Sequence, residues 1–430
     1  MAKFFLYDES MASAKAKITT AKLAEMGDVV APEKQYIAAA GEDAPDEIEI
    51  IGGVLVAVGE SIFKTIATTL TAADLDVGAA FSVGTDYNIF VCDPTDGDET
   101  VDEDEVYKIS TSKYFPSGYT AANSRRIGGF HYGAVRKVDE DTGNPVNSSG
   151  VEMGSGWESN VYNGIVPNSV WTLLHRPKCD PAGMVYIGGG LWGDIYLASS
   201  DGEDGLQSKK GVNPITGSEG LNWYIANEKA RRVGKRLPTY AEFCQASYGS
   251  PAGQDNNNTY AWSATGNSGR TTCGNVTYAV SATNVRDLVG NVWKWVDEFC
   301  LDPTATTWAW QDVLGSGHGQ AYIPSSTALR AFVCGGSWSY GVHDGDRAVN
   351  CNNYPWNVNS NIGVWCVVTF EFLDGYLSAD TARAYCKSFT YSQTIVKKRL
   401  RFPVRIATKI KKHRPRSNQK AKRGAGIVWK

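Results

Sequence analysis

The sequence predicts an α+β protein, in which a β-rich N-terminal part precedes a domain with two helices and several short strands. Gly accounts for 45 of the 430 residues and aromatic residues for 11%, a composition that favours short strands joined by glycine-containing turns over a helical bundle. Apolar residues at positions 221, 225, 226 and 230 share one helical face. Strand-like segments cluster between positions 183 and 197.

We expect four parts along the chain: a β-rich N-terminal domain over 1–135, a connection over 136–182, a folded domain over 183–370, and a basic tail over 371–430. In the first part, Ile48–Val58 is typical of one or two strands around a Gly turn. Thr71 caps a helical turn that runs to Asp76. Phe81–Cys92 is expected to form a pair of strands.

The third part opens with expected strands at Met184–Ile187 and Leu191–Leu197. A helix is predicted over Leu221–Val233, and a second over Tyr240–Ala246. Thr239 is the natural N-cap of the second helix, and Glu242 completes a capping box with it.

The net charge of −4 is divided unevenly along the chain. Residues 371–430 hold 16 Lys and Arg against 3 Asp and Glu, so the tail is strongly basic and the remainder acidic. Such a tail is either a contact for nucleic acid or an acidic partner, or a solvated appendage. We favour the appendage and do not expect nucleic acid as a partner.

No apolar run reaches membrane-spanning length, and the first eight residues do not resemble a secretory signal. The nine Cys are scattered without a CxxC pair, which excludes a zinc ribbon or thioredoxin-type centre and favours buried thiols. The acidic segment Asp93–Glu105 lacks the ligand spacing of an EF-hand loop. His131 has no second ligand at metal spacing and is expected to be a packed histidine. We therefore expect neither metal nor cofactor.

Residues 335–368 have the composition of a binding surface. Gly335-Gly336-Ser337-Trp338 is followed by a run of aromatic, Asn and charged residues with no helical period. Tyr and Trp offer large contact area at low entropic cost, and Asn and Ser are adaptable hydrogen-bonding groups. An irregular surface loop between two edge strands would have a similar composition, so both interpretations stay open here.

Several motifs occur in one order: Gly234–Phe243 (GKRLPTYAEF), Leu288–Trp295 (LVGNVWKW), Gly335–Trp338 (GGSW) and Asn361–Gly363 (NIG). Together they resemble the formylglycine-generating-enzyme-like branch of the C-type lectin fold, over about residues 183–368. The resemblance implies two helices and a small mixed sheet that support an irregular, loop-rich face. Gly335, Gly336, Trp338, Trp293 and Trp295 would belong to the scaffold.

Within that branch, the stretch from GGSW to NSNIG resembles the variable proteins of diversity-generating retroelements, which include phage tropism determinants at tail-fibre tips. In that family the stretch is rewritten at adenines of the coding template, so Asn codons are favoured targets. The resemblance implies a receptor-binding protein with a hypervariable surface over about 339–365. The implied ligand-binding residues are Ser339, Tyr340, His343, Asp344, Asp346, Arg347, Tyr354, Trp356 and Trp365.

The same resemblance implies a host cell-surface protein or glycan as ligand, other phage tail proteins as partners, a homotrimer, and a place at the tail-fibre tip of a virion. It also implies that residues 1–135 form a stalk or assembly domain. A bacterial surface-displayed or cytoplasmic binding protein is the alternative. A copper oxidase is a competing function, but the oxidases carry a Cys pair just after GGS, whereas Cys351 is the first Cys after Gly336 here. Lys294 stands where the oxidases place a calcium-binding Glu. A calcium lectin is disfavoured because no Glu-Pro-Asn or Gln-Pro-Asp motif is present.

Overall fold

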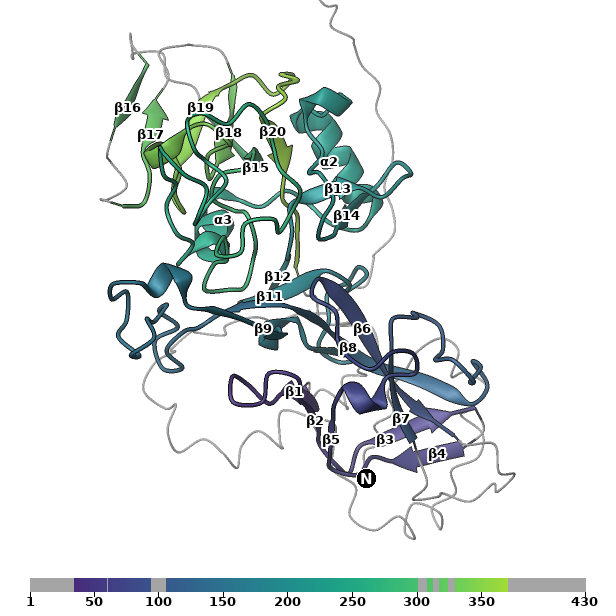
Figure 1. Ribbon diagram of the computed structural model, residues 1–430. Coiled ribbons are helices and arrows are strands. Elements are labelled where there is room, and N and C mark those ends of the chain that lie inside the picture. The colour runs from purple at the N-terminus through teal and green to yellow at the C-terminus, as the bar shows by residue number, and fades with distance from the viewer. Residues whose placement is uncertain are drawn as a thin grey trace, which may run out of the picture. The chain divides into compact units, whose positions relative to one another are not determined.

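The computed structural model describes residues 35–59, 61–93, 106–300, 308–311, 317–323 and 329–369 (Figure 1). The basic tail and most of the acidic segment Asp93–Glu105 lie outside these residues. Among the described residues, no helix has both the length and the apolar character needed to cross a membrane.

Two small antiparallel sheets begin the described chain. Their strands follow the alternation of strand residues, since Ile48 and Ile50 are buried while Glu49 between them is exposed. The expected strands around the Gly turn are β2 and β3, and the expected turn after Thr71 is a 3₁₀ helix that Thr71 and Asp74 close with a capping box. One sheet contains β1 (Ile37–Ala39), β2 (Ile48–Ile50) and β5 (Thr68–Leu70), the other β3 (Leu55–Val58) and β4 (Ser61–Lys64), and the 3₁₀ helix is η3 (Ala72–Asp74).

A five-stranded antiparallel sheet follows. The expected pair of strands at Phe81–Cys92 is wrong, because β6 is a single strand and Phe81 lies before it, with its ring packed against Tyr87 and Phe130. Two strands of this sheet come from the expected connection 136–182. The elements are β6 (Thr85–Cys92), β7 (Val106–Ser110), β8 (Ser124–Arg136), β9 (Val161–Ile165) and β10 (Trp171–Thr172), with η4 (Trp157–Ser159) and η5 (Pro167–Ser169) between them.

The C-terminal half is built on a six-stranded mixed sheet in the order β16-β17-β19-β18-β15-β20. β15 pairs with β20, and β17 with β19, in parallel, while the other neighbours are antiparallel. Its strands are β15 (Trp293–Cys300), β16 (Ala309–Gln311), β17 (Ala321–Ile323), β18 (Arg330–Cys334), β19 (Val349–Asn353) and β20 (Ile362–Val364). Two smaller sheets contain β11 (Met184–Gly188), β12 (Leu191–Asp194) and β21 (Val367–Thr369), and β13 (Ala198–Ser200) and β14 (Leu206–Ser208).

Both predicted helices are present. Helix α2 (Trp223–Arg232) is capped by the Asn222 side chain, which accepts a hydrogen bond of 3.0 Å from the Ile225 amide. Helix α3 (Tyr240–Ser247) begins with the expected capping box: Thr239 Oγ1 accepts from the Glu242 amide at 3.2 Å, and Glu242 accepts from the Thr239 amide at 2.8 Å. Short 3₁₀ helices η6 (Gly217–Glu219) and η7 (Gly341–His343) complete the helical elements described.

The two helices bury opposite faces of the six-stranded sheet. Ala226 and Ala230 of α2 pack in one cluster with Trp293 and Trp295. Phe243 of α3 packs in another cluster with alternate strand residues such as Cys334 and Val349. Since successive strand residues point to opposite faces, this alternation gives the sheet two buried sides. The arrangement confirms the expected α+β class with two helices on a small mixed sheet.

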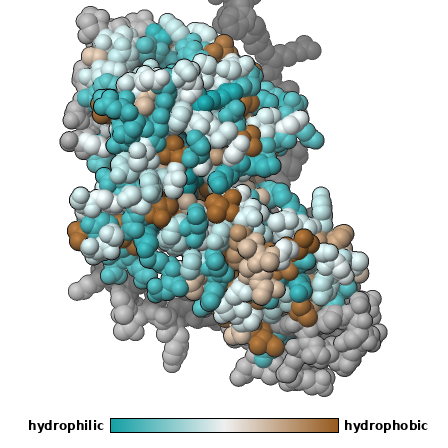
Figure 2. Space-filling view, viewed as in Figure 1, coloured by the Kyte–Doolittle hydropathy of each residue, from teal (hydrophilic) through white to brown (hydrophobic). Residues whose placement is uncertain are grey.

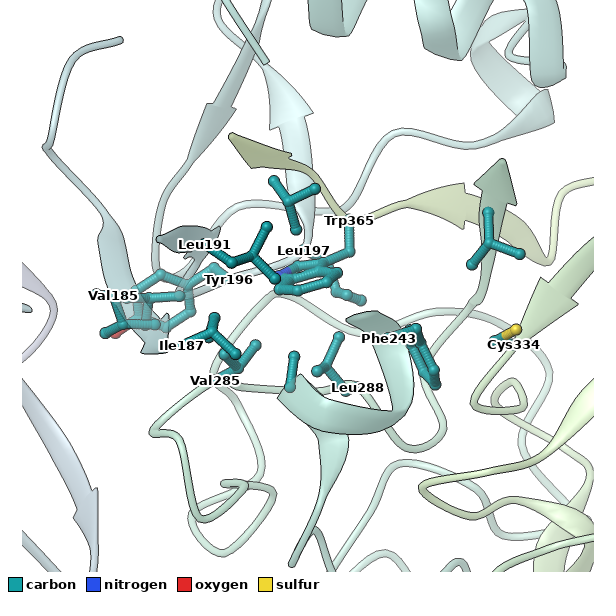
Figure 3. Packing of buried hydrophobic residues seen from close by; sticks show 14 of the residues in the cluster. Val185, Ile187, Leu191, Tyr196, Leu197, Phe243, Val285, Leu288, Cys334 and Trp365 are labelled. Atoms are coloured by element: carbon teal, nitrogen blue, oxygen red, sulfur yellow. The ribbon is translucent and has the colours of Figure 1, made fainter. Parts of the chain in front are cut away.

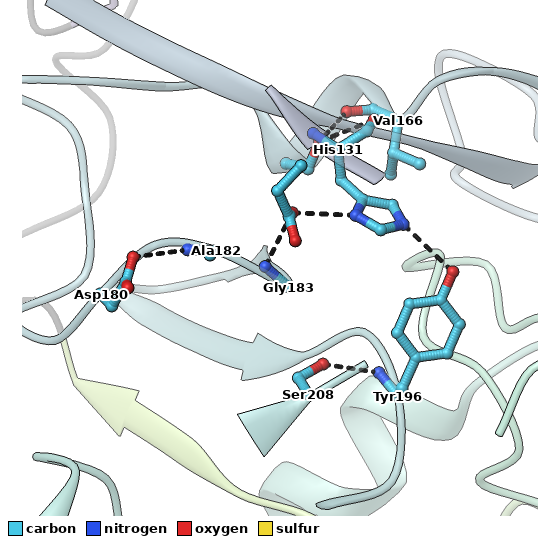
Figure 4. Close-up of polar contacts among 9 residues, drawn as sticks. His131, Val166, Asp180, Ala182, Gly183, Tyr196 and Ser208 are labelled. Carbon is cyan, nitrogen blue, oxygen red and sulfur yellow. Dashed lines mark hydrogen bonds and ion pairs between the residues drawn. The ribbon is translucent and has the colours of Figure 1, made fainter. Parts of the chain in front are cut away.

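The five-stranded sheet is joined to the C-terminal half by buried polar contacts. Arg136, at the end of β8, is 1% exposed, and its guanidinium donates to the main-chain oxygens of Tyr278 at 2.8 Å and of Val280 at 3.0 and 3.1 Å. The His131 ring lies between Asp86, 2.9 Å from Nδ1, and the Tyr196 hydroxyl, 3.1 Å from Nε2 (Figure 4). His131 is therefore packed and hydrogen-bonded, as expected.

Candidate binding site

The stretch that follows β18 is held by a tight turn with two glycines. Gly335 and Gly336 have φ of +83° and +88°, and a Cβ on Gly336 would lie 1.7 Å from Oδ1 of Asp344. Asp344 is fully buried, and its carboxylate accepts a hydrogen bond of 3.2 Å from the Ser337 amide. Burial raises the pKa of Asp344 well above its ordinary value. Asp344 therefore belongs to the turn, which corrects its assignment as a ligand-binding residue.

Asp346 is also part of the scaffold. Its side chain is buried and lies 2.9 Å from Nδ1 of His318, and its main-chain oxygen accepts a 2.5 Å hydrogen bond from Ser247 at the end of α3. The next residue, Arg347, is half-buried, and its main-chain oxygen accepts from the Tyr240 hydroxyl at 2.8 Å. These contacts fix the chain against α3 and correct the expectation that Asp346 contacts a ligand.

Trp365 lies in the core rather than on the surface. It is 0% exposed, and Figure 3 shows its indole beside Leu191 and Leu197. Its Nε1 donates a 2.7 Å hydrogen bond to the main-chain oxygen of Asp194. The interpretation of Trp365 as an exposed anchor was therefore wrong. Trp338, which was expected in the core, is only half-buried.

An aromatic stack stands out from the surface between β19 and β20. Trp356 is 55% exposed, and its ring stacks on Tyr354 with a centroid distance of 4.9 Å and an angle of 10°. The buried guanidinium of Arg330 lies 3.6 Å from the Tyr354 ring centroid. On the face shown in Figure 2, the hydrophobic residues of the C-terminal half are scattered among hydrophilic ones, as in ordinary soluble domains. A supported and exposed ring pair such as this one is suited to contact a partner.

Beside this stack the sheet carries a hollow of about 320 Å³. Its row of side chains is set by strand register, since Trp310 of β16 pairs with Tyr322 of β17, and Tyr322 with Asn350 of β19. Paired residues point to the same face of a sheet. Tyr340 closes one side, with its ring 5.4 Å from that of Trp293. His343 stacks on Trp310 at 4.9 Å and lies 2.7 Å from Gln320.

Amide side chains complete the wall of the hollow. They belong to Asn350, Asn352, Asn353, Asn359 and Asn361. Asn350, Asn352 and Asn353 lie in the stretch that composition identified as a binding surface, although they were not among the assigned ligand-binding residues.

The aromatic residues Trp293, Trp310 and Tyr322 were missed as well. Trp293 was assigned to the scaffold, and the strand pairing that brings Trp310 and Tyr322 next to Asn350 is a long-range contact with no local sequence signal.

The predicted ligand-binding residues thus fall into two groups. Asp344, Asp346 and Trp365 are buried and hold the scaffold together. The remaining ones have exposed or partly exposed side chains: Ser339, Tyr340, His343, Arg347, Tyr354 and Trp356. Of these six, Tyr340 lines the hollow directly.

The described residues contain no group of three or more His, Cys, Asp or Glu arranged to hold a metal ion. The Lys294 ammonium lies in the core and donates to the main-chain oxygens of Leu288, at 2.9 Å, and Gly290, at 2.7 Å. Burial lowers the pKa of Lys294 to about 7. Here an ammonium group takes the carbonyl oxygens that a hard cation would prefer as ligands.

Comparisons with known proteins match two parts of the chain. Residues 38–158 match the family described as the Mtd second domain, and residues 198–370 match the family described as the sulfatase-modifying factor enzyme 1-like domain. The tail fiber receptor-binding protein of Bordetella phage BPP-1 is 30% identical over 330 residues, which cover 70% of this chain and 73% of that protein.

Solved structures are similar over most of the chain. The major tropism determinant I1 variant has a TM-score of 0.57 at 25% identity and covers 82% of this chain and 88% of its own. The M1 variant has a TM-score of 0.57 at 24% identity and covers 83% and 89%. With both parts of the fold matched and a relative at 30% identity over most of both chains, this chain belongs to the family of the phage tail-fibre receptor-binding proteins, the major tropism determinants.

Proposed function

We propose that this protein is the receptor-binding tip of a phage tail fibre and binds a molecule on the host cell surface. The binding surface consists of the exposed and half-buried residues between Ser339 and Val358 together with the wall of the hollow. The observation that carries the proposal is the Tyr354–Trp356 stack, in which the exposed Trp356 ring lies on a half-buried Tyr354 that contacts the buried Arg330. Rigid aromatic anchors of this kind supply much of the binding energy of protein interfaces.

The N-terminal sheets would serve as the stalk or assembly part that contacts other tail proteins, and the fibre tip would be a homotrimer. Three copies would bind a cell surface with higher avidity than one site gives alone. No catalytic step is proposed, and the buried Lys294 and the spacing of Cys334 and Cys351 support a binding role over copper oxidation.

Binding of the fluorescently labelled full chain to a panel of bacterial strains tests the proposal. Trp356→Ala should weaken binding to the positive strain roughly 30-fold, the loss typical of a hot-spot residue. Tyr224→Ala is the matched control, because Tyr224 is a 50% exposed aromatic residue on α2, outside the proposed surface. Equal binding by both variants would refute the surface.

Sequencing of the DNA around the gene tests whether this surface is diversified by a retroelement. We expect a reverse transcriptase gene and a template repeat near the coding sequence, with differences confined to adenines of the template and to codons within about 339–365. Differences spread evenly through the coding sequence would contradict the proposal that this surface is diversified.

A further inference from the structure

The hollow beside the aromatic stack lies on the sheet face that α2 covers only in part. Trp310, Tyr322 and Asn350 form a cross-strand row with Val333 and Trp295 on this face. Val333 and Trp295 belong to the cluster that contains the α2 residues, whereas Tyr322 and Asn350 line the hollow. Most of the lining therefore comes from strands, which position ligand-binding groups more firmly than loops do, while Tyr340, Asn359 and Asn361 lie in connecting segments.

Many of the amide groups in the hollow are not used by the fold. Asn350 Oδ1 accepts from the Asn352 amide at 2.8 Å, and Asn353 Oδ1 accepts from Asn359 Nδ2 at 3.4 Å. Within the described part of the chain, the side-chain amides of Asn352 and Asn361 form no hydrogen bond. The side-chain amide nitrogens (Nδ2) of Asn350 and Asn353 form none either. These groups offer donors and acceptors to a ligand.

A buried donor lies beside the same amides. Trp293 lines the hollow and is 1% exposed, and its indole N–H has no hydrogen-bond partner of ordinary geometry among the described residues. Burial raises the pKa of Tyr340, whereas a hydrogen bond with the Trp293 side chain lowers it, so the Tyr340 hydroxyl is a weak partner of this N–H. A buried N–H with only a weak partner is costly, and an acceptor on a bound molecule would reduce that cost.

The lining also excludes charged ligands. Aromatic rings, amides and Ile362 make up the wall, and none of the residues that line it is Asp, Glu, Lys or Arg. An ionised ligand would lose water there without gaining a counter-charge. An apolar anchor would fit poorly as well, because it would bury the free amides without partners. Polyhydroxylated rings meet both demands, since their hydroxyls pair with amides and their C–H faces pack on aromatic rings.

We propose that this hollow binds a neutral sugar residue of a host surface glycan. This rests on the proposed receptor-binding function and names the chemical class of ligand. Asn352 and Asn361 would hydrogen-bond the sugar hydroxyls, the Trp293 indole N–H would donate to a sugar oxygen, and Tyr322 and Tyr340 would pack against the ring. A hollow of this size lies at the lower end of small-molecule sites and suits one sugar ring.

In the test, the full chain is titrated with methyl glycosides of glucose, galactose, mannose and N-acetylglucosamine. Saturation-transfer NMR and Trp fluorescence measure the binding. N-acetylneuraminic acid is the charged comparison, and a neutral N-acetyl tripeptide amide represents a peptide ligand. We expect at least one neutral glycoside to bind with a dissociation constant of about 1 mM or below. The charged sugar and the tripeptide should not bind.

Two variants locate the binding. Asn352→Leu keeps the side-chain shape and removes the amide, so it should weaken glycoside binding about tenfold or more. Tyr224→Ala, which lies on α2 and outside the proposed binding surface, should leave glycoside binding unchanged. Folding of both variants is checked by circular dichroism.

Three results would overturn the inference: no neutral glycoside binds up to about 50 mM, Asn352→Leu binds as well as the wild type, or the tripeptide binds in preference. Failure of the sugar inference differs from failure of the proposed function. If cells are bound and Trp356→Ala abolishes this, while no glycoside binds, the receptor-binding function stands and the glycan class is wrong. If a glycoside binds to the chain but the chain binds to no bacterial strain, the hollow is a sugar site and the receptor-binding function is wrong.

Discussion

Replacing Trp365 by Ala tests whether this residue belongs to the scaffold. The indole is fully buried, lies 6.5 Å from the Phe243 ring and donates a 2.7 Å hydrogen bond to the Asp194 main-chain oxygen. Truncation of a buried Trp to Ala costs about 3–5 kcal/mol, and loss of the buried hydrogen bond places Trp365→Ala toward the upper end of that range. Trp365→Phe keeps much of the apolar contact and should cost about 1–2 kcal/mol less.

Gly193, which packs against the Trp365 indole, allows a second test. A Cβ on Gly193 would lie 2.4 Å from Cζ2 of Trp365, so Gly193→Ala should itself destabilise the fold by overpacking. Phe in place of Trp365 lacks the Cζ2 atom. The cost of Gly193→Ala should therefore shrink by about 1 kcal/mol or more in a Trp365→Phe background, as expected for residues in contact.

Urea unfolding followed by far-ultraviolet circular dichroism measures all of these changes. Trp356→Ala is the control and should alter the free energy of unfolding by less than about 0.5 kcal/mol, because its side chain is mostly exposed. If Trp365→Ala costs no more than Trp356→Ala, the assignment of Trp365 to the core fails.

Four other outcomes are expected. The pKa of Lys294 falls to about 7 on folding, so above pH 7 the unfolded chain binds more protons than the folded chain. The free energy of unfolding of the wild type, relative to that of Lys294→Met, should therefore rise between pH 7 and 8.5, by at most about 1.4 kcal/mol per pH unit. A difference that does not change with pH would contradict this. A chain that ends at Phe370 keeps every described strand and should retain a cooperative melt; loss of that melt would show that the tail supports the fold. Light scattering should give about three times the chain mass of 46.6 kDa, whereas a concentration-independent monomer would exclude the trimer. Elemental analysis should find no stoichiometric copper, and copper together with peptide oxidation would favour the oxidase.

Local sequence signals predicted the helices well. The capping box of Thr239 and Glu242 and the apolar face of α2 involve residues only a few positions apart, so their spacing carries the information. The same holds for the Gly335–Gly336 turn, whose close approach to Asp344 explains why no larger residue stands there.

The direction of each side chain after Trp338 could not be predicted. This stretch has no period of two or 3.6 residues, so nothing in it distinguished buried Asp344 and Asp346 from half-buried His343. Composition identified it as a binding surface but gave no register. Trp310 and Tyr322 reach the hollow through two strand pairings, Trp310 with Tyr322 and Tyr322 with Asn350, which join residues 12 and 28 positions apart and which local patterns do not encode.

The joint at Arg136 has a consequence for how this protein tolerates change. Its guanidinium donates hydrogen bonds to the main-chain oxygens of Trp157, Glu158, Tyr278 and Val280, and it also lies 5.4 Å from the Trp157 ring centroid. A carbonyl is present whichever amino acid occupies the position. Substitutions at Tyr278 can therefore accumulate without breaking the attachment, as long as the backbone keeps its path, whereas Val280 is fully buried and is also constrained by packing. Arg136 itself has no such freedom, because Lys could not serve carbonyls on several sides with one ammonium group. Substitutions should therefore be more frequent at residues such as Tyr278, which contribute only a main-chain oxygen to this contact, than at Arg136.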